Sequence, residues 1–349
     1  MRKRLDTQFQ SPKVKSLDAS LRKYIVGQDP AIEQIVNIYQ TYLAGISSPG
    51  QPIGNFLFLG PTGTGKTRIV EAVSQHLFGD TRAVIKVDCA EFQHSHEIAK
   101  LIGSPPGYLG HRDTHPMLSQ EVLQQYYTEN CKMSIVLFDE IEKASDALWN
   151  LLLGVLDKAS LTLGDNRRVD FSRAMIFMTS NLGARQMGEA LAPPMGFCQT
   201  VKSVKHADLS KIAIEAARKK FTPEFMNRIN KMVVFQSLGK KELAQILDLE
   251  LNEVRNRLQN GTPRCRFELS AGARRLLLKE GFDQKYGARP LKRAIERLLV
   301  DPLASLLASE QLMWGDFLHI GCQGDSLIFE RDVKSSVRTI PGLLGDKAA

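Results

Sequence analysis

The sequence predicts an α/β protein of two domains: a larger one built on a parallel β-sheet and a smaller C-terminal one. Five short, mostly apolar segments recur between helical patterns, as expected for parallel strands covered by helices on both faces. These segments are residues 55–59, 83–88, 134–139, 174–180 and 231–235. After Phe235 the pattern changes to an amphipathic helix, and 349 residues are enough for about two domains.

The second domain is expected to be smaller and mainly helical. Residues 240–259 carry an apolar stripe at helical spacing, formed by Leu243, Leu247, Leu251, Val254 and Leu258. Further helices are expected at 270–281 and 288–309, and short strands at 264–268, 316–321 and 326–331. A polar stretch at 185–210 containing Pro and Gly is expected to be an inserted loop. The predicted division is a basic tail at 1–16, a large domain at 17–236, a small domain at 237–335 and a flexible tail at 336–349.

The composition is that of an ordinary globular protein, with 43% hydrophobic and 24% charged residues. No apolar run approaches the roughly 20 residues that a membrane span needs. The basic N-terminus has no apolar core of a secretory signal. Five cysteines lie far apart without a C-x-x-C pair, which favours reduced thiols. We therefore expect a cytoplasmic protein with no membrane partner.

The net charge of +8 suggests a nucleic-acid partner, but its distribution argues against one. Residues 1–24 hold seven basic and two acidic side chains, so most of the excess lies near the N-terminus. A solvated tail explains this clustering better than a binding surface on the folded domains.

A phosphate-binding loop is predicted at residues 60–67. The segment follows an apolar strand and precedes a helical pattern, which is the context such a loop requires. Its glycines let backbone N–H groups converge on a polyphosphate, Lys66 would reach the β- and γ-phosphates, and the Thr67 hydroxyl would ligate Mg²⁺. The predicted ATP-binding residues are Gly60, Pro61, Thr62, Gly63, Thr64, Gly65, Lys66 and Thr67.

Two carboxylates end the apolar strand at 134–139. Groups at the carboxyl end of a parallel strand are expected beside the phosphate loop. Asp139 suits Mg²⁺ binding, and Glu140 can polarise the attacking water. A helix cap after a buried strand would explain one of these acids, but not their combination with the loop at 60–67.

The chain resembles the AAA+ ATPases of the Clp chaperone family, specifically the second ATPase module of ClpB, ClpC and ClpA. The resemblance runs from about Leu17 to about Phe329 and implies a P-loop AAA+ large domain with a smaller α+β domain. Besides the two motifs above, it rests on Val26-Gly27-Gln28, Glu142-Lys143-Ala144, Thr179-Ser180-Asn181, Pro223-Glu224-Phe225-Met226-Asn227-Arg228 and Gly287-Ala288-Arg289-Pro290-Leu291.

The resemblance assigns further roles at the ATP site. Asn181 matches sensor 1, which orients the lytic water, although a turn-forming Asn is common after a strand. Arg228 matches the arginine finger that reaches the neighbouring subunit's γ-phosphate. Arg289 matches sensor 2, and Ile25 and Val26 match the residues beside the adenine. Two apolar residues in a core would look the same as this last pair.

Two loops match segments that act on protein partners in the family. Gly107-Tyr108-Leu109-Gly110 resembles the pore loop, whose aromatic ring grips an unfolded or tagged polypeptide. Met195-Gly196-Phe197 matches in position and form the tripeptide by which ClpA, ClpC and ClpX dock a barrel peptidase such as ClpP; ClpB lacks it. The alternative for the first segment is a Pro/Gly turn with an incidental tyrosine. The alternative for the second is a loop anchored to the surface by its Met and Phe side chains.

The resemblance implies a homo-hexameric ring that hydrolyses ATP to unfold or remodel proteins, with substrates supplied by the pore or by a separate adaptor. Two alternatives remain open. One is a nucleic-acid motor or clamp-loader-like ATPase, suggested by the pI near 9.2. The other is a regulatory scaffold that binds ATP without turnover, which would not require Lys66, Asp139, Glu140, Arg228 and Arg289 together.

Overall fold

The computed structural model describes two compact units. The described residues are 10–104, 115–191, 206–261, 265–283 and 286–332. The first unit extends to Ile246 and also includes Phe282–Pro290. The second takes Leu247–Gly281 and the chain from Leu291 onward.

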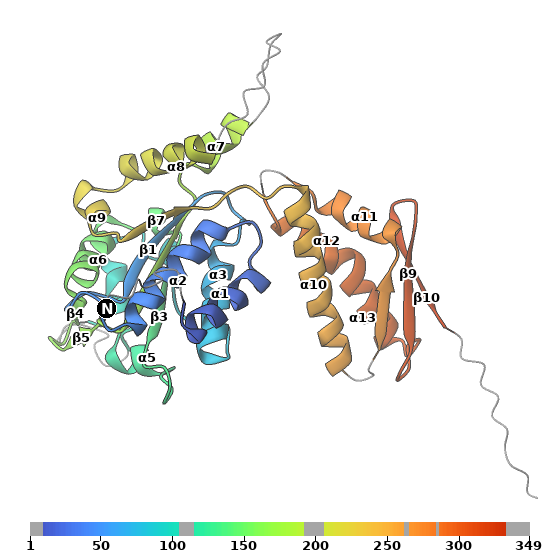
Figure 1. The fold of residues 1–349 in the computed structure, drawn as a ribbon, viewed down its shortest axis with the longest axis horizontal. Coiled ribbons are helices and arrows are strands. Elements are labelled where there is room, and N and C mark those ends of the chain that lie inside the picture. The colour runs from blue at the N-terminus through green and yellow to red at the C-terminus, as the bar shows by residue number, and fades with distance from the viewer. Residues whose placement is uncertain (1–9, 105–114, 192–205, 262–264, 284–285, 333–349) are drawn as a thin grey trace, which may run out of the picture. The chain divides into compact units, whose positions relative to one another are not determined.

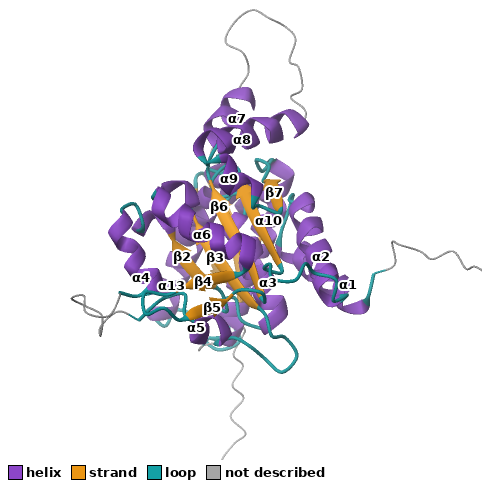
Figure 2. Cartoon of the chain, turned by 90° about the vertical axis from the view of Figure 1, so that its left-hand side faces the viewer, coloured by secondary structure: helices purple, strands orange, loops and turns teal. Residues whose placement is uncertain are grey.

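A five-stranded parallel sheet forms the centre of the first unit, as predicted (Figure 2). The spatial order is β2-β3-β6-β1-β7. The strands are β1 (Gly54–Leu59), β2 (Ile85–Asp88), β3 (Ser134–Asp139), β6 (Ala174–Ser180) and β7 (Lys231–Val234). Because β1, β3 and β6 are almost entirely buried, they read in the sequence as continuous apolar runs rather than as alternating ones.

Helices cover both faces of this sheet, because successive strand residues point to opposite sides. On one face, Phe56 and Phe177 stack with ring centroids 5.0 Å apart, in a core shared with α1 (Pro12–Tyr24), α2 (Asp29–Leu43) and α3 (Lys66–Phe78). On the other face the core includes residues of α6 (Asp146–Lys158), α8 (His206–Lys220) and α9 (Pro223–Asn227). Figure 1 shows α1–α3 and α6 on opposite sides of the strands.

Several short elements complete the first unit. They are α4 (Ala99–Ile102), α5 (Gln120–Gln124), α7 (Ala184–Leu191), the hairpin β4 (Ser160–Thr162) and β5 (Arg168–Asp170), and 3₁₀ turns at Cys89–Glu91, Ser95–Ile98 and Ile141–Lys143.

The prediction of a loop at 185–210 is wrong at both ends. Residues 185–191 belong to α7, and 206–210 begin α8. The adjacent prolines Pro193 and Pro194, which suggested a loop, fall between these helices and outside the described residues. Buried Met187 and Leu209 join the core, so packing stabilises both helices despite their polar sequences.

The predicted basic tail is too long by at least five residues. Helix α1 begins at Pro12, which has the fixed φ that favours a first helical position. The Ser11 hydroxyl accepts a hydrogen bond from the Val14 N–H, and Val14 itself is buried. Residues 12–16 are therefore part of the folded first unit.

The second unit combines helices with a three-stranded sheet of order β10-β9-β8. Strands β8 (Arg266–Leu269) and β9 (Phe317–Gln323) are parallel, whereas β10 (Ser326–Arg331) is antiparallel to β9. The helices are α10 (Lys240–Asn260), α11 (Ala271–Gly281), α12 (Arg289–Ile295) and α13 (Asp301–Ala308). The single helix predicted at 288–309 contains a π-helical turn, Glu296–Val300, between α12 and α13.

The boundary between the two units lies inside α10, after Ile246 and beyond the boundary predicted between residues 236 and 237. The first turns of α10 belong to the first unit, where Glu242 accepts a hydrogen bond from the Gly239 N–H and lies close to Gly27.

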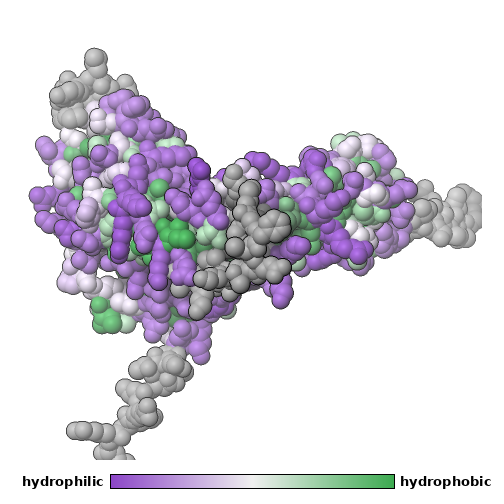
Figure 3. Space-filling model, turned by 90° about the horizontal axis from the view of Figure 1, so that it is seen from above, coloured by the Kyte–Doolittle hydropathy of each residue, from purple (hydrophilic) through white to green (hydrophobic). Residues whose placement is uncertain are grey.

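Hydrophilic side chains cover most of the face in Figure 3, and hydrophobic ones form small groups there. Among the described residues, no helix has the length and apolar character that crossing a membrane requires.

Candidate active site

The phosphate loop connects β1 to α3 and depends on glycine at two close approaches. Gly60 has φ +132°, and a Cβ there would lie 2.5 Å from the Phe235 carbonyl oxygen. Gly63 has φ +73°, and its Cβ would lie 2.2 Å from the Tyr286 carbonyl oxygen. Any side chain at either position would clash with backbone, so the loop conformation requires glycine at both.

Lys66, the first residue of α3, is buried and donates three hydrogen bonds. Its Nζ lies 2.7 Å from the Gly60 carbonyl oxygen, 2.8 Å from that of Pro61 and 2.9 Å from Asn181 Oδ1. The pKa of Lys66 is lowered to about 8, chiefly by burial and to a lesser extent by the charge of Arg289, while nearby carboxylates led by Glu142 oppose the shift.

Asn181 joins the phosphate loop to the carboxylates after β3. It directly follows β6, which lies between β1 and β3 in the sheet. Its Oδ1 accepts from Lys66, and its Nδ2 donates to Glu140 Oε1 at 3.2 Å. One amide group therefore contacts both the phosphate-loop lysine and the candidate base.

Glu140 has a strained backbone that is held by hydrogen bonds. Its φ of 56° and ψ of 48° are left-handed, an uncommon conformation for a residue other than glycine. The Glu140 N–H donates to Thr179 Oγ1 at 3.0 Å, and the Thr179 hydroxyl donates to Asp139 Oδ1. The Asn181 N–H donates to Glu142 Oε1 at 3.0 Å. The turn that carries Glu140 and Glu142 is thus attached to the end of β6.

Gln28 ties the predicted adenine segment to the phosphate loop. Its buried side chain donates to the carbonyl oxygens of Thr64 (3.2 Å) and Gln236 (3.0 Å) and accepts from the Gln236 N–H. Ile25 is buried and Val26 is half-buried, three and two residues before Gln28. The hydrogen bonds of Gln28 therefore connect this segment to the predicted phosphate loop.

The two predicted arginines have different surroundings. Arg289 begins α12, and the preceding Ala288 N–H donates to the Gly63 carbonyl oxygen at 3.0 Å, so Arg289 lies beside the phosphate loop. Arg228 ends α9, and its guanidinium pairs with Asp157 of α6 at 3.2 Å. The structure therefore brings Arg289 to the chain's own site but not Arg228.

Comparison with known proteins accounts for both units. Residues 51–232 match the family described as "AAA domain (Cdc48 subfamily)", and residues 238–320 match "C-terminal, D2-small domain, of ClpB protein". The chain is a Clp-family AAA ATPase module. The order of its two units is that of the C-terminal ATPase module of this family.

Named relatives and solved structures agree with this assignment. The chain is 38% identical over 320 residues to the chaperone protein ClpB of Bdellovibrio bacteriovorus, and 36% identical over 321 residues to the ClpC subunit of Staphylococcus saprophyticus. These alignments cover 92% of this chain but only 35% and 38% of the relatives. A structure of S. cerevisiae Hsp104 with casein superimposes with a TM-score of 0.79 at 30% identity, covering 93% of this chain and 53% of that one.

The residues of this Clp-family site suit a nucleotide-bound Mg²⁺. Thr67 Oγ1 lies 3.5 Å from Asp139 Oδ1, which pairs a hydroxyl with a carboxylate. Mg²⁺ on a nucleotide takes one or two protein oxygens and completes its coordination with phosphates and water. Among the described residues there is no cluster of three His, Cys, Asp or Glu side chains that could hold a metal ion.

Sequence reasoning missed part of the site, and part of its prediction lies outside the described residues. Thr179, Glu142 and Gln28 stood in quoted motifs without assigned roles, although their buried or strand-end positions were a usable signal. Lys86 was missed entirely, because only the pairing of β2 with β3 brings it to Asp139.

The predicted pore loop at 107–110 and docking tripeptide at 195–197 are not among the described residues.

We predict that nucleotide affinity falls as the pH rises above about 8. Bound phosphate would stabilise the charged form of Lys66, so binding requires proton uptake wherever free Lys66 is neutral. Titration calorimetry with a slowly hydrolysed ATP analogue, in buffers of different ionisation enthalpy, should give uptake of about 0.1 proton at pH 7 and about 0.9 at pH 9.

The same pKa shift affects the nucleotide-free protein. Between pH 8 and about 10.4 the unfolded chain binds more protons at Lys66 than the folded chain does, so this group makes folding more favourable as the pH rises through that window.

For the nucleotide-binding experiment, proton uptake on binding that is equal at pH 7 and pH 9 would contradict the assignment of the pKa shift to Lys66.

Proposed function

We propose that this chain hydrolyses Mg-ATP and uses the energy to pull on polypeptide. The observation that carries the ATPase proposal is the Asn181 amide, which hydrogen-bonds both to Lys66 and to Glu140. Groups that bind phosphate and activate water must act on one γ-phosphate, and this amide holds their side chains next to each other.

Each group then has a distinct role. Lys66 would bind the β- and γ-phosphates, and Thr67 and Asp139 would hold Mg²⁺, whose positive charge would stabilise the negative charge on the phosphates. Glu140 accepts a proton from water as the water oxygen attacks the γ-phosphorus and the bond to the ADP oxygen breaks. Asn181 positions Glu140 and the water, and Arg289 adds positive charge beside the phosphate loop.

Replacing Glu140 by Gln should remove hydrolysis but keep binding. The amide retains an acceptor for Asn181 Nδ2 but has no proton affinity at neutral pH, so the ATPase rate should fall about 10²- to 10⁴-fold. Phosphate release and binding of a fluorescent ATP analogue measure the two effects. Exposed Glu129→Gln is the matched control and should match wild type; turnover in Glu140→Gln near the wild-type rate would remove Glu140 as the base.

Arg228 is proposed to act on a neighbouring subunit, because topology keeps it from its own site. Strands β1 and β7 are parallel, with Leu59 opposite Val234 and Phe56 opposite Lys231. The phosphate loop leaves the carboxyl end of β1, whereas Arg228 precedes the amino end of β7, so about 13 Å of strand separates them. Its side chain is 40% exposed, while its Nε is buried and has no hydrogen-bond partner in the described part of the chain. Such a group can pair across an interface in a homo-hexameric ring.

Mixing two inactive variants tests this trans role. Arg228→Ala should assemble but lose about 10³- to 10⁵-fold in ATPase rate, and Lys66→Ala should not bind nucleotide productively. In rings mixed one to one, about a quarter of interfaces combine an intact Lys66 with an intact Arg228 from the next subunit, so activity should return. Absence of recovery in rings shown to be mixed would place the arginine's action within its own chain.

Polypeptide is the proposed substrate because of the relatives and the solved structure to which the chain is similar. Its relatives include a chaperone and a subunit of a Clp protease, and Hsp104 has been solved with casein. The loop at 107–110, with Tyr108 between glycines, is the proposed grip. Docking of a ClpP-like peptidase through Met195-Gly196-Phe197 remains a further proposal that rests on the resemblance.

The ATPase rate with casein, compared with single-stranded DNA, separates this function from a nucleic-acid motor. We expect stimulation by casein only. Tyr108→Ala should keep the basal rate and lose the stimulation, whereas Tyr126→Ala, at an ordinary half-buried position, should keep both. Stimulation by DNA alone would replace the polypeptide proposal with the nucleic-acid alternative.

A further inference from the structure

A second lysine, Lys86, contacts the carboxylate proposed to bind Mg²⁺. It belongs to β2, the strand next to β3, and its Nζ lies 3.1 Å from Asp139 Oδ2. Lys66 is not this partner, since its three hydrogen bonds go to Gly60, Pro61 and Asn181. Lys86 is therefore the side-chain cation that pairs with Asp139 in the described part of the chain.

The two oxygens of Asp139 have separate partners. Oδ1 accepts from the Thr179 hydroxyl and lies within reach of Thr67 Oγ1, whereas Oδ2 pairs with Lys86. The Lys86 side chain is 53% exposed and that of Asp139 only 20%, so the lysine can leave while the carboxylate stays. A dication at Asp139 would repel the ammonium group beside it.

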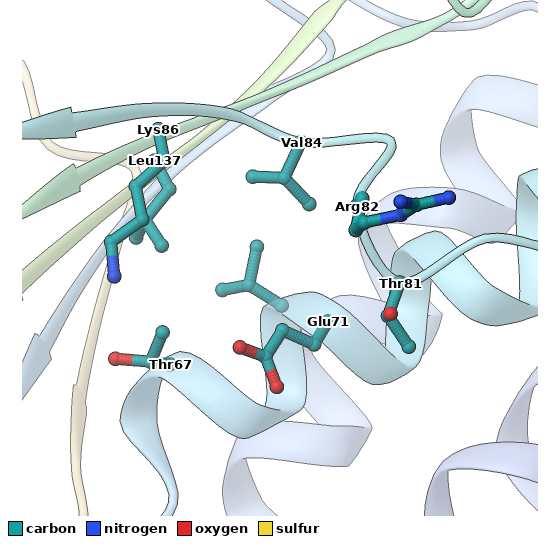
Figure 4. A pocket seen from close by; sticks show the side chains of 8 residues that line it. Thr67, Glu71, Thr81, Arg82, Val84, Lys86 and Leu137 are labelled. Atoms are coloured by element: carbon teal, nitrogen blue, oxygen red, sulfur yellow. The ribbon is translucent and has the colours of Figure 1, made fainter.

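A pocket beside Lys86 offers a second carboxylate. It has a volume of about 330 Å³ and is lined by Thr67, Val70, Glu71, Thr81, Arg82, Val84, Lys86 and Leu137. Figure 4 shows the Lys86 amine and the Glu71 carboxylate on the same side of this pocket, near Thr67. Glu71 follows Thr67 by four residues on α3, so both occupy one face of the helix. Its present partner is Arg68, at 3.5 Å on the helix surface.

We propose that Lys86 holds the place of Mg²⁺ at Asp139 and moves to Glu71 when Mg-nucleotide binds. The inference rests on the proposed ATPase function and adds a competition to it. Each Mg²⁺ that binds must displace an ammonium group, so the lysine lowers Mg²⁺ affinity and eases metal release with the product. The pocket gives the displaced side chain a carboxylate to pair with.

The test compares nucleotide affinity in excess Mg²⁺ with that in EDTA, using a fluorescent ATP analogue in the Glu140→Gln background. In Lys86→Met, the ratio of the two affinities should rise about two- to fivefold, the range that a partly exposed ion pair supports. Lys86→Arg keeps the cation and should stay near the reference ratio. Glu71→Gln removes the second partner and should lower the ratio.

Arg82→Met is the matched control. Arg82 lines the same pocket but pairs with Asp80 rather than Asp139, so its replacement removes one positive charge without changing the partner of Asp139. It separates competition at Asp139 from a general loss of positive charge. A ratio in Lys86→Met that equals the reference, or that rises no more than in Arg82→Met, overturns the competition. An unchanged ratio in Glu71→Gln overturns the movement into the pocket. If the Glu140→Gln reference binds no nucleotide, the ATPase proposal itself fails, so the two failures can be told apart.

Discussion

The position of β6 between β1 and β3 is the constraint on which the site depends. Parallel strands end at one edge of a sheet, and neighbouring strands lie about 4.8 Å apart. The residue after β6 therefore falls between the phosphate loop and the acidic turn, within reach of both. Asn181 has a donor and an acceptor on one short side chain, so it can join Lys66 to Glu140. With another strand order, the same motifs in the same sequence would not meet.

Three groups of the site are held by partners within the chain that a bound nucleotide and its metal would compete with. Lys66 is desolvated and bound to its own loop, Glu140 has a left-handed backbone, and Asp139 is neutralised by Lys86. Desolvation of Lys66 and the left-handed backbone of Glu140 cost free energy, which the packing of the sheet beneath them offsets. A triphosphate with its metal offers stronger partners to the same groups. In the proposed function, this difference supplies the binding energy for rearranging the loop.

Local motifs made much of this site predictable, whereas contacts between distant segments did not. The loop at 60–67 and the acids after β3 follow from spacing and burial alone, and the five apolar runs gave the strands. Lys86 could not be found in this way, because its importance comes from its neighbour in the sheet. Helices α7 and α8 were misread as loop because the prolines between them dominated the local pattern. The place of Arg228 at the opposite edge of the sheet follows from the position of β7 beside β1. The sequence predicts parallel strands here but not which strands are neighbours.

The contact between the phosphate loop and residues 286–288 has a practical consequence for the design of truncated forms of the protein. The Gly63 carbonyl oxygen accepts from the Ala288 N–H, and both Gly63 and Gly287 lack the side chains that would force these backbones apart. This partner returns to the first unit after 35 residues of the second, Leu247–Gly281. A gene fragment ending at Ile246 would thus encode every strand of the large sheet and the whole phosphate loop, but not the segment that bonds to Gly63. A minimal ATPase would need residues 282–290 restored through an engineered linker.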